Sequence, residues 1–216
     1  MVTNTLFNNK EKAFKLKSDS KLESAYFLFK MIANEPLVKI GTAATRFALN
    51  LHLPVEGLIR STVFDHFCAG VNEEDCLPTV DNLYDAGVYS VLDYSVEGKA
   101  EENQFDATLA KIIELTRFAE NKEAMPFSVF KPTGLGRFKI WEKVSANSAL
   151  TETEKGEWQR IRKRYDEVCK VAHDCSISLL IDGEESWMQA AADALCEEMM
   201  EKYNKKTPIV YNFFFF

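Results

Sequence analysis

Two charged side chains follow two short apolar segments, and their types and spacing could do chemistry together. Lys131 follows Phe127–Phe130, a segment with a proline on either side, and Asp182 follows Ser176–Ile181. Both segments are rich in aromatic or β-branched residues, which is typical of buried strands. Neighbouring parallel strands lie about 4.8 Å apart, so we expect the ammonium and the carboxylate to meet as a pair. We predict that both residues are catalytic and that Lys131 also binds an anionic substrate.

Other interpretations of this pair stay open. A buried ion pair can be purely structural, and the side chain of Lys131 could instead reach solvent along the rim of the sheet. A lysine at a strand end could also form a Schiff base if burial lowered its pKa. A nearby aspartate argues against this third interpretation, because an opposite charge favours the ammonium form.

Further polar residues follow the predicted strands. Asp93 and Tyr94 end the segment Tyr89–Tyr94 and Glu97 follows it. Asp93 either lines the same site or caps the turn. Glu184 and Glu185 follow Asp182, and we expect at least one of them to be an ordinary acid at a helix start, where the helix dipole favours negative charge.

Histidine and cysteine give weaker signals. His66 lies within a predicted strand, where a lone histidine is more often a core or rim residue than a ligand, and Cys68 has no base oriented towards it. The chain has three histidines, at positions 52, 66 and 173, which are scattered, so no metal site is predicted. The chain has no G-x-S-x-G, G-x-G-x-x-G or P-loop motif.

Strand and helix patterns alternate along most of the chain. The first 59 residues read as a helical arm, with one helix ending at Asn34–Pro36 and a second running from Leu37 to about Leu51. Predicted strands follow at 62–68, 89–94, 127–131, 176–182 and from 208, and predicted helices at 73–86, around 109–116, at 137–144, from the capping box at Thr151, and at 187–200.

This alternation favours an α/β fold with a parallel sheet. We predict a partial eight-stranded TIM-like barrel, with about four βα units and the start of a fifth strand, in residues 60–216, preceded by the helical arm in residues 1–59. A full barrel typically takes about 250 residues, and the chain ends on four phenylalanines. We therefore expect a fragment of a longer protein, or a reading that leaves frame near its end.

Composition excludes several classes of protein. Of the 216 residues 46% are hydrophobic and 27% charged, as in ordinary globular proteins, and the net charge of −7 disfavours nucleic acid as a partner. The five cysteines show no CxxC spacing and suit a reducing compartment. No membrane span and no signal-peptide core is apparent, so we expect a cytoplasmic protein.

Five segments occur in an order and spacing that resemble the proline dehydrogenase family: 62–70 (TVFDHFCAG), 90–98 (SVLDYSVEG), 130–136 (FKPTGLG), 180–187 (LIDGEESW) and 209–212 (IVYN). The resemblance implies a distorted α/β barrel with FAD at the mouth. It implies oxidation of L-proline to 1-pyrroline-5-carboxylate, with hydride transfer to FAD and electrons passed to a quinone, and leaves peripheral membrane association open.

The same resemblance implies roles for the pair. Lys131 falls on a lysine that helps two arginines bind the proline carboxylate, and Asp182 falls on an aspartate beside that charge cluster. The sequence departs from the family at Phe215, where a flavin-contacting glutamine is expected, and most cofactor-binding positions lie beyond the C-terminus. The alternatives are an aldolase-like barrel enzyme that uses Lys131 without flavin, and a non-catalytic half barrel.

Overall fold

A computed structural model describes residues 8–94 and 100–213 of the protein. The chain forms two compact units, unit 1 before and unit 2 after the division between Leu83 and Tyr84. The predicted boundary after residue 59 lies within unit 1. The predicted division into a helical arm and a barrel domain concerns the complete protein, and it remains a prediction.

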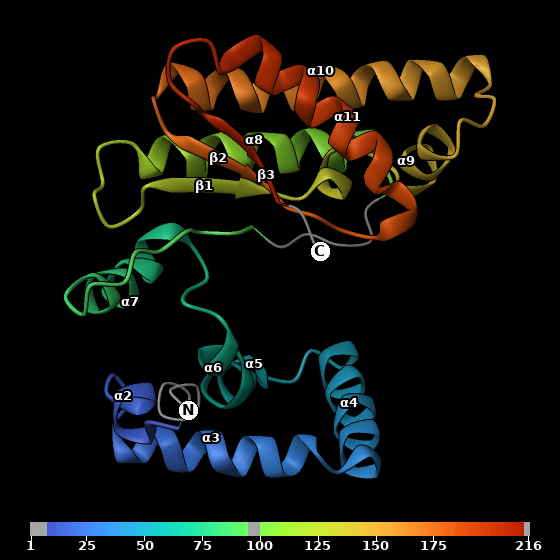
Figure 1. The fold of residues 1–216 in the computed structure, drawn as a ribbon. Coiled ribbons are helices and arrows are strands. Elements are labelled where there is room, and N and C mark those ends of the chain that lie inside the picture. The colour runs from blue at the N-terminus through green and yellow to red at the C-terminus, as the bar shows by residue number, and fades with distance from the viewer. Residues whose placement is uncertain (1–7, 95–99, 214–216) are drawn as a thin grey trace. The chain divides into compact units, whose positions relative to one another are not determined.

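Unit 1 consists of helices. These are α2 (Lys10–Phe14), α3 (Asp19–Ile32), α4 (Glu35–Asn50), α5 (Glu56–Ile59), the π-helix η1 (Arg60–Phe64), α6 (Asp65–Phe67) and α7 (Glu73–Tyr84), which reaches the division. The helical arm is therefore present, and α3 and α4 cross at a steep angle (Figure 1). The break between them lies where Asn34 caps α4, since its side chain accepts a hydrogen bond from the Leu37 N–H and Pro36 occupies the first turn.

The first predicted strand, residues 62–68, is wrong. Its residues lie in η1 and α6, and the Cys68 N–H donates to the Phe64 carbonyl over 2.8 Å. The spacing of apolar residues in so short a segment does not tell a strand from a buried helix. No strand is described in unit 1 that could pair with it, so its backbone groups bond along the chain. His66 is half-buried, and its ring packs edge-on against Phe29 and Phe67.

Unit 2 combines helices with a small parallel sheet. Its elements are α8 (Glu102–Ala119), β1 (Phe127–Phe130), the 3-10 helix η2 (Pro132–Leu135), α9 (Phe138–Ser145), α10 (Glu152–Asp174), β2 (Ser178–Ile181), α11 (Ser186–Tyr203) and β3 (Val210–Asn212). The second predicted strand, residues 89–94, is wrong, because these residues have no regular secondary structure and join no sheet. A backbone bond from the Ser90 N–H to the Ala124 carbonyl, 2.9 Å long, ties this segment to the chain before β1.

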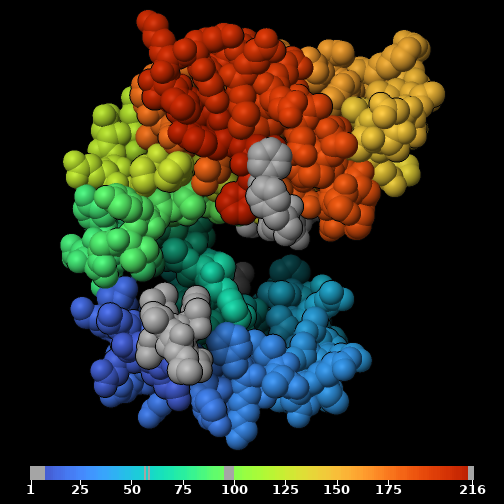
Figure 2. Space-filling model, in the orientation of Figure 1, coloured from blue at the N-terminus to red at the C-terminus, as the bar shows by residue number. Residues whose placement is uncertain are grey.

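The sheet has the order β1-β2-β3, with both pairs parallel. Phe130 pairs with Ile181, and Ile181 with Asn212. The helices α8, α10 and α11 cover one face of the sheet (Figure 1), and α11, in orange-red, lies at the surface in the space-filling view (Figure 2). The fold is therefore α/β, as predicted, with a smaller parallel sheet than the four to five strands expected.

Local signals place the covering helices. Thr151 and Glu154 form the predicted capping box at the start of α10, and Gly87, predicted to end a helix, adopts φ +79° after α7. The predicted apolar face of α10 is buried against the sheet, and it includes Ile161, Tyr165 and Val168. These helices pack against the sheet and so support the residues at its carboxyl end.

Candidate functional site

The carboxyl end of the sheet brings the two predicted side chains together. Lys131 follows β1 directly and Asp182 follows β2 directly, and the Asp182 N–H donates to the Phe130 carbonyl over 3.1 Å. The ammonium of Lys131 donates a hydrogen bond to Oδ2 of Asp182. The two side chains are 27% and 26% exposed, so the pair is largely shielded from solvent but still accessible.

The electrostatic environment keeps Lys131 charged. The hydrogen bond to Asp182 raises the pKa of Lys131, burial opposes this rise, and the charges of Asp182, Asp93 and Glu184 add to it. Asp93 is therefore close enough to the ammonium to act on it. A raised pKa disfavours the neutral amine that a Schiff base requires, so this geometry argues against the aldolase-like alternative.

A second contact between the same two segments resembles the first and lies two residues further along each of them. Glu184 accepts hydrogen bonds from the Thr133 N–H (2.8 Å) and from the Thr133 hydroxyl (2.6 Å). Lys131 and Asp182 are 51 positions apart, and so are Thr133 and Glu184, which is the offset of the β1–β2 register. Burial raises the pKa of Glu184, although the two bonds from Thr133 act in the opposite direction.

Side-chain amides extend this network to β3. Gln189 accepts a bond from the Glu184 N–H over 3.1 Å and donates to Asp193 over 2.7 Å. Asn212, the last residue of β3, donates to the same Asp193 oxygen over 2.7 Å. Hydrogen bonds therefore connect the carboxyl ends of all three strands through α11.

A buried arginine holds the turn after Lys131 from another direction. Arg164 of α10 is 5% exposed and donates to the Leu135 carbonyl over 3.1 Å. It also donates to Asp106 and Glu102 at the start of α8. Arg164 lies on the apolar face of α10, and this position was the signal by which sequence reasoning could have found it.

Comparison with known proteins identifies the family. The sequence profile described as "Proline dehydrogenase" matches residues 76–214. The chain belongs to the proline dehydrogenase family. Proline dehydrogenase 1, mitochondrial, of Dictyostelium discoideum is 27% identical over 201 residues, which cover 76% of this chain and 35% of that protein. The carbapenem antibiotics biosynthesis protein CarD of Pectobacterium carotovorum subsp. carotovorum is 29% identical over 155 residues, which cover 72% of this chain and 41% of CarD.

Part of a solved structure has a similar fold. Proline utilization A (PutA) from Bdellovibrio bacteriovorus, inactivated by N-propargylglycine, matches with a TM-score of 0.53 and 16% identity, over 67% of this chain and 16% of that one. The chain spans less than half of the length of the relatives that it matches. The chain, with its three-stranded sheet, therefore matches only a part of that larger protein.

The other residues that the sequence analysis singled out lie at various positions in the chain. Tyr94 is exposed at the end of the segment 89–94, and Glu97 lies outside the described residues. Glu185 is the N-cap residue of α11 and fits the predicted acid at a helix start, whereas Glu184 bonds Thr133. His66 and Cys68 belong to unit 1. Phe215 also lies outside the described residues.

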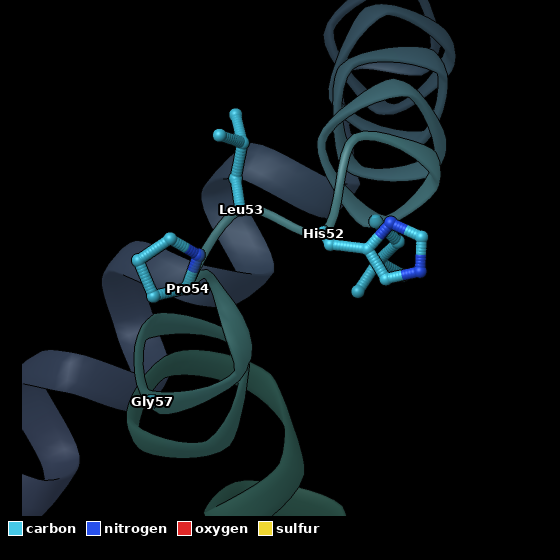
Figure 3. Close-up of a pocket in the computed structure, with 5 residues that line it drawn as sticks. His52, Leu53, Pro54 and Gly57 are labelled. Atoms are coloured by element: carbon cyan, nitrogen blue, oxygen red, sulfur yellow. The ribbon is translucent and has the colours of Figure 1, made fainter.

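Hollows are described in unit 1 and in unit 2. One, of about 520 Å³, is lined by Leu49, His52, Leu53, Pro54 and Gly57 of unit 1, and its single titratable side chain, His52, projects in a different direction from Pro54 (Figure 3). Within residues 8–94 and 100–213 no cluster of metal-binding side chains occurs, and none of the helices there is long and apolar enough to cross a membrane.

Proposed function

We propose that this chain forms the part of a proline dehydrogenase that binds the carboxylate of L-proline, and that the protein oxidises L-proline to 1-pyrroline-5-carboxylate in proline catabolism. The observation that carries the proposal is the ion pair of Lys131 and Asp182 at the carboxyl end of two parallel strands, the edge at which α/β barrels bind their substrates. The family suggests the reaction, and this geometry supports the role that we propose for the two residues.

The two residues would have different roles in substrate binding. The ammonium of Lys131 is charged at neutral pH and can donate to a carboxylate while it remains bonded to Asp182, since it has three donors. Asp182 restricts the direction of the ammonium, so the substrate carboxylate is met at one position. The proline ring is then held in a single orientation, which is the protein's main contribution to a cofactor-dependent oxidation.

FAD belongs to the proposal as the cofactor of the complete enzyme, where it would accept a hydride from the proline ring. The described edge does not fit the whole dinucleotide. Its cation, Lys131, is already paired, and the carboxylates Asp93, Asp182 and Glu184 act on it, so an FAD pyrophosphate there would meet mainly negative charge. We therefore derive no step of the reaction through FAD from these residues.

The cellular setting is part of the same proposal. A quinone would take the electrons onward, and the protein would work in the cytoplasm with peripheral contact to a membrane. The absence of a membrane-crossing helix among the described residues is compatible with this arrangement. The names of several relatives place those proteins in mitochondria.

Binding of L-proline to the purified chain tests the proposal. We expect calorimetry to show binding by the wild type and an affinity at least about tenfold lower for Lys131→Met, because a hydrogen bond to a charged group is lost. Lys155→Met, on the exposed side of α10, is the matched control and should bind as the wild type does. Equal affinity of Lys131→Met and the wild type would contradict the proposal.

Two further measurements separate the alternatives. With FAD added, bleaching of the flavin absorbance by L-proline would show oxidation by this chain, and the absence of both binding and bleaching would favour a non-catalytic half barrel. Borohydride trapping of a substrate adduct on Lys131 would instead favour the aldolase-like enzyme.

A further inference from the structure

The turn that follows Lys131 is held more tightly than an ordinary strand-to-helix connection. Lys131 is the N-cap residue of η2, and the Gly134 N–H closes the turn onto the Lys131 carbonyl over 3.0 Å. Pro132 has no N–H. Thr133 therefore carries the N–H of this first turn that no backbone carbonyl accepts, and such groups at helix starts need another acceptor.

Glu184 supplies that acceptor from a different part of the chain. Its two carboxylate oxygens accept separate hydrogen bonds, one from the Thr133 N–H and one from the Thr133 hydroxyl. A bidentate contact of this kind determines both the position and the rotation of the turn, whereas one bond would leave the turn free to rotate. The backbone that carries Lys131 is thereby fixed relative to the segment that carries Asp182.

We propose that Glu184 is a positioning residue, which acts through Thr133 to hold the Lys131 ammonium against Asp182 and towards the substrate carboxylate. The inference rests on the proposed function of Lys131 and goes further by naming the residues that aim it. Glu184 itself is held by Gln189, whose side chain accepts the Glu184 N–H, so the carboxylate does not depend on Thr133 alone for its place.

Other contacts hold the far end of the turn, away from Lys131. Arg164 holds the Leu135 carbonyl at the far end of η2, and Gly136 lies so close to Ile161 that an added Cβ would come within 2.2 Å of it. These contacts determine how closely the turn packs against α8 and α10. The end of the turn next to Lys131 is fixed by Thr133 and Glu184.

The reactivity of the Lys131 amine tests the inference without any ligand. Trace acetylation with acetic anhydride, measured by mass spectrometry against Lys155 of the same molecule, reports how firmly the amine is held as an ammonium. Thr133→Val removes one hydrogen bond and no charge, so it changes geometry alone. We expect acetylation of Lys131 to become about fivefold faster in Thr133→Val, as the loss of one such bond implies.

Three more variants complete the design. Glu184→Gln should also raise the reactivity of Lys131, and Thr133→Ser, which keeps the hydroxyl, should restore the wild-type rate. Glu185→Gln removes the same charge from the exposed neighbouring residue and should leave the rate unchanged. Unchanged reactivity of Lys131 in folded Thr133→Val and Glu184→Gln proteins, judged by their melting temperatures, would overturn the inference.

The proposed function fails in a different way. If Lys131→Met binds L-proline as the wild type does, carboxylate binding by Lys131 is wrong, whatever the acetylation rates are. If Lys131→Met loses binding while Thr133→Val changes neither acetylation nor affinity, the proposed function stands and the positioning role of Glu184 is wrong. A loss of proline affinity in Thr133→Val that Thr133→Ser restores supports both.

Discussion

The two units of the chain place their apolar side chains in opposite ways. In unit 2, large side chains such as Phe105, Phe130 and Trp141 are almost fully buried around the sheet. In unit 1, Leu28 and Val80 are the buried hydrophobic residues among those described, whereas many aromatic and aliphatic side chains are exposed, including Tyr26, Phe27, Ile40 and Phe47.

The difference shows what the sheet contributes. Parallel strands give α8, α10 and α11 a common apolar face to cover, and a continuous core results. The helices of unit 1 have no such face and are supported by caps and local bonds, which give little stability to helices of this length. We therefore expect unit 2 to unfold cooperatively and unit 1 to depend mainly on local interactions.

A pair of phenylalanine substitutions should show the largest contrast. Phe130→Ala removes a ring that is 1% exposed and should lower the free energy of unfolding of unit 2 by about 3–5 kcal/mol. Phe47→Ala removes a ring that is 66% exposed and should change it by less than about 0.5 kcal/mol. All three tryptophans lie in unit 2, so urea unfolding followed by tryptophan fluorescence measures this unit. Equal losses would contradict the comparison.

Replacing a glycine by alanine should destabilise unit 2 at one position and stabilise a helix of unit 1 at another. Gly136→Ala brings Cβ into Ile161 and should destabilise unit 2 by about 1–3 kcal/mol. Gly41→Ala, in the middle of α4 with nothing within 4 Å, should stabilise that helix by about 0.5–1 kcal/mol. The first effect is measured by fluorescence and the second by hydrogen exchange of α4. The double variant Gly136→Ala/Ile161→Ala should lose less than the sum of its single changes, and strict additivity would exclude the clash.

Helix caps give a smaller contrast. Thr151→Ala removes half of the capping box of α10 and should cost about 1 kcal/mol in the unfolding of unit 2. Ser18→Ala removes the cap of α3 and should lower helicity there without moving the fluorescence transition. A shift of that transition by Ser18→Ala would show that the units unfold together.

Acid should weaken unit 2 through Glu102. Hydrogen bonds from Arg160, and then from Arg164, lower the pKa of Glu102 from 4.5 to about 2, although burial opposes them. This contribution to stability is therefore complete above pH 4.5 and lost as the pH falls towards 2. Because the carboxylate is 41% exposed, we expect Glu102→Gln to cost less than about 1 kcal/mol at neutral pH.

The pH dependence distinguishes the loss of the Glu102 ion pairs from a general weakening of the protein in acid. The difference between the wild type and Glu102→Gln in urea unfolding should shrink as the pH falls through that range. Glu35→Gln, which breaks an ion pair in unit 1 with side chains 77% and 75% exposed, should produce no pH-dependent difference in the fluorescence transition. A constant difference for Glu102→Gln would show that its pKa is not lowered.

Sequence reasoning succeeded where local and global signals agree. The capping box at Thr151, the Asn34–Pro36 break and the apolar strands after Pro126 and Ser176 each have one favourable local structure, and the helices around them supply the burial that those patterns require. The meeting of Lys131 with Asp182 followed from placing two charges after two parallel strands.

The failures have a physical reason. Residues 62–68 and 89–94 are apolar enough for strands, but a strand also needs a neighbour to accept its backbone bonds, and neighbours depend on the whole fold. The roles of Glu184 and Arg164 were missed because their partners, Thr133 and the Leu135 carbonyl, are distant in sequence. The position of Arg164 on the apolar face of α10 marks that residue as unusual but does not identify its partner, and Glu184 has no such local signal.

The shared offset of 51 positions between β1 and β2 has a consequence for misfolding. If these strands paired one residue out of step, Lys131 would lie opposite Ile181 or Gly183, and its charge would have no partner at the end of the sheet. Thr133 would likewise lose Glu184. Because an unpaired charge in a shielded place is costly, the same residues that we assign to substrate binding also penalise the wrong alignment of the strands.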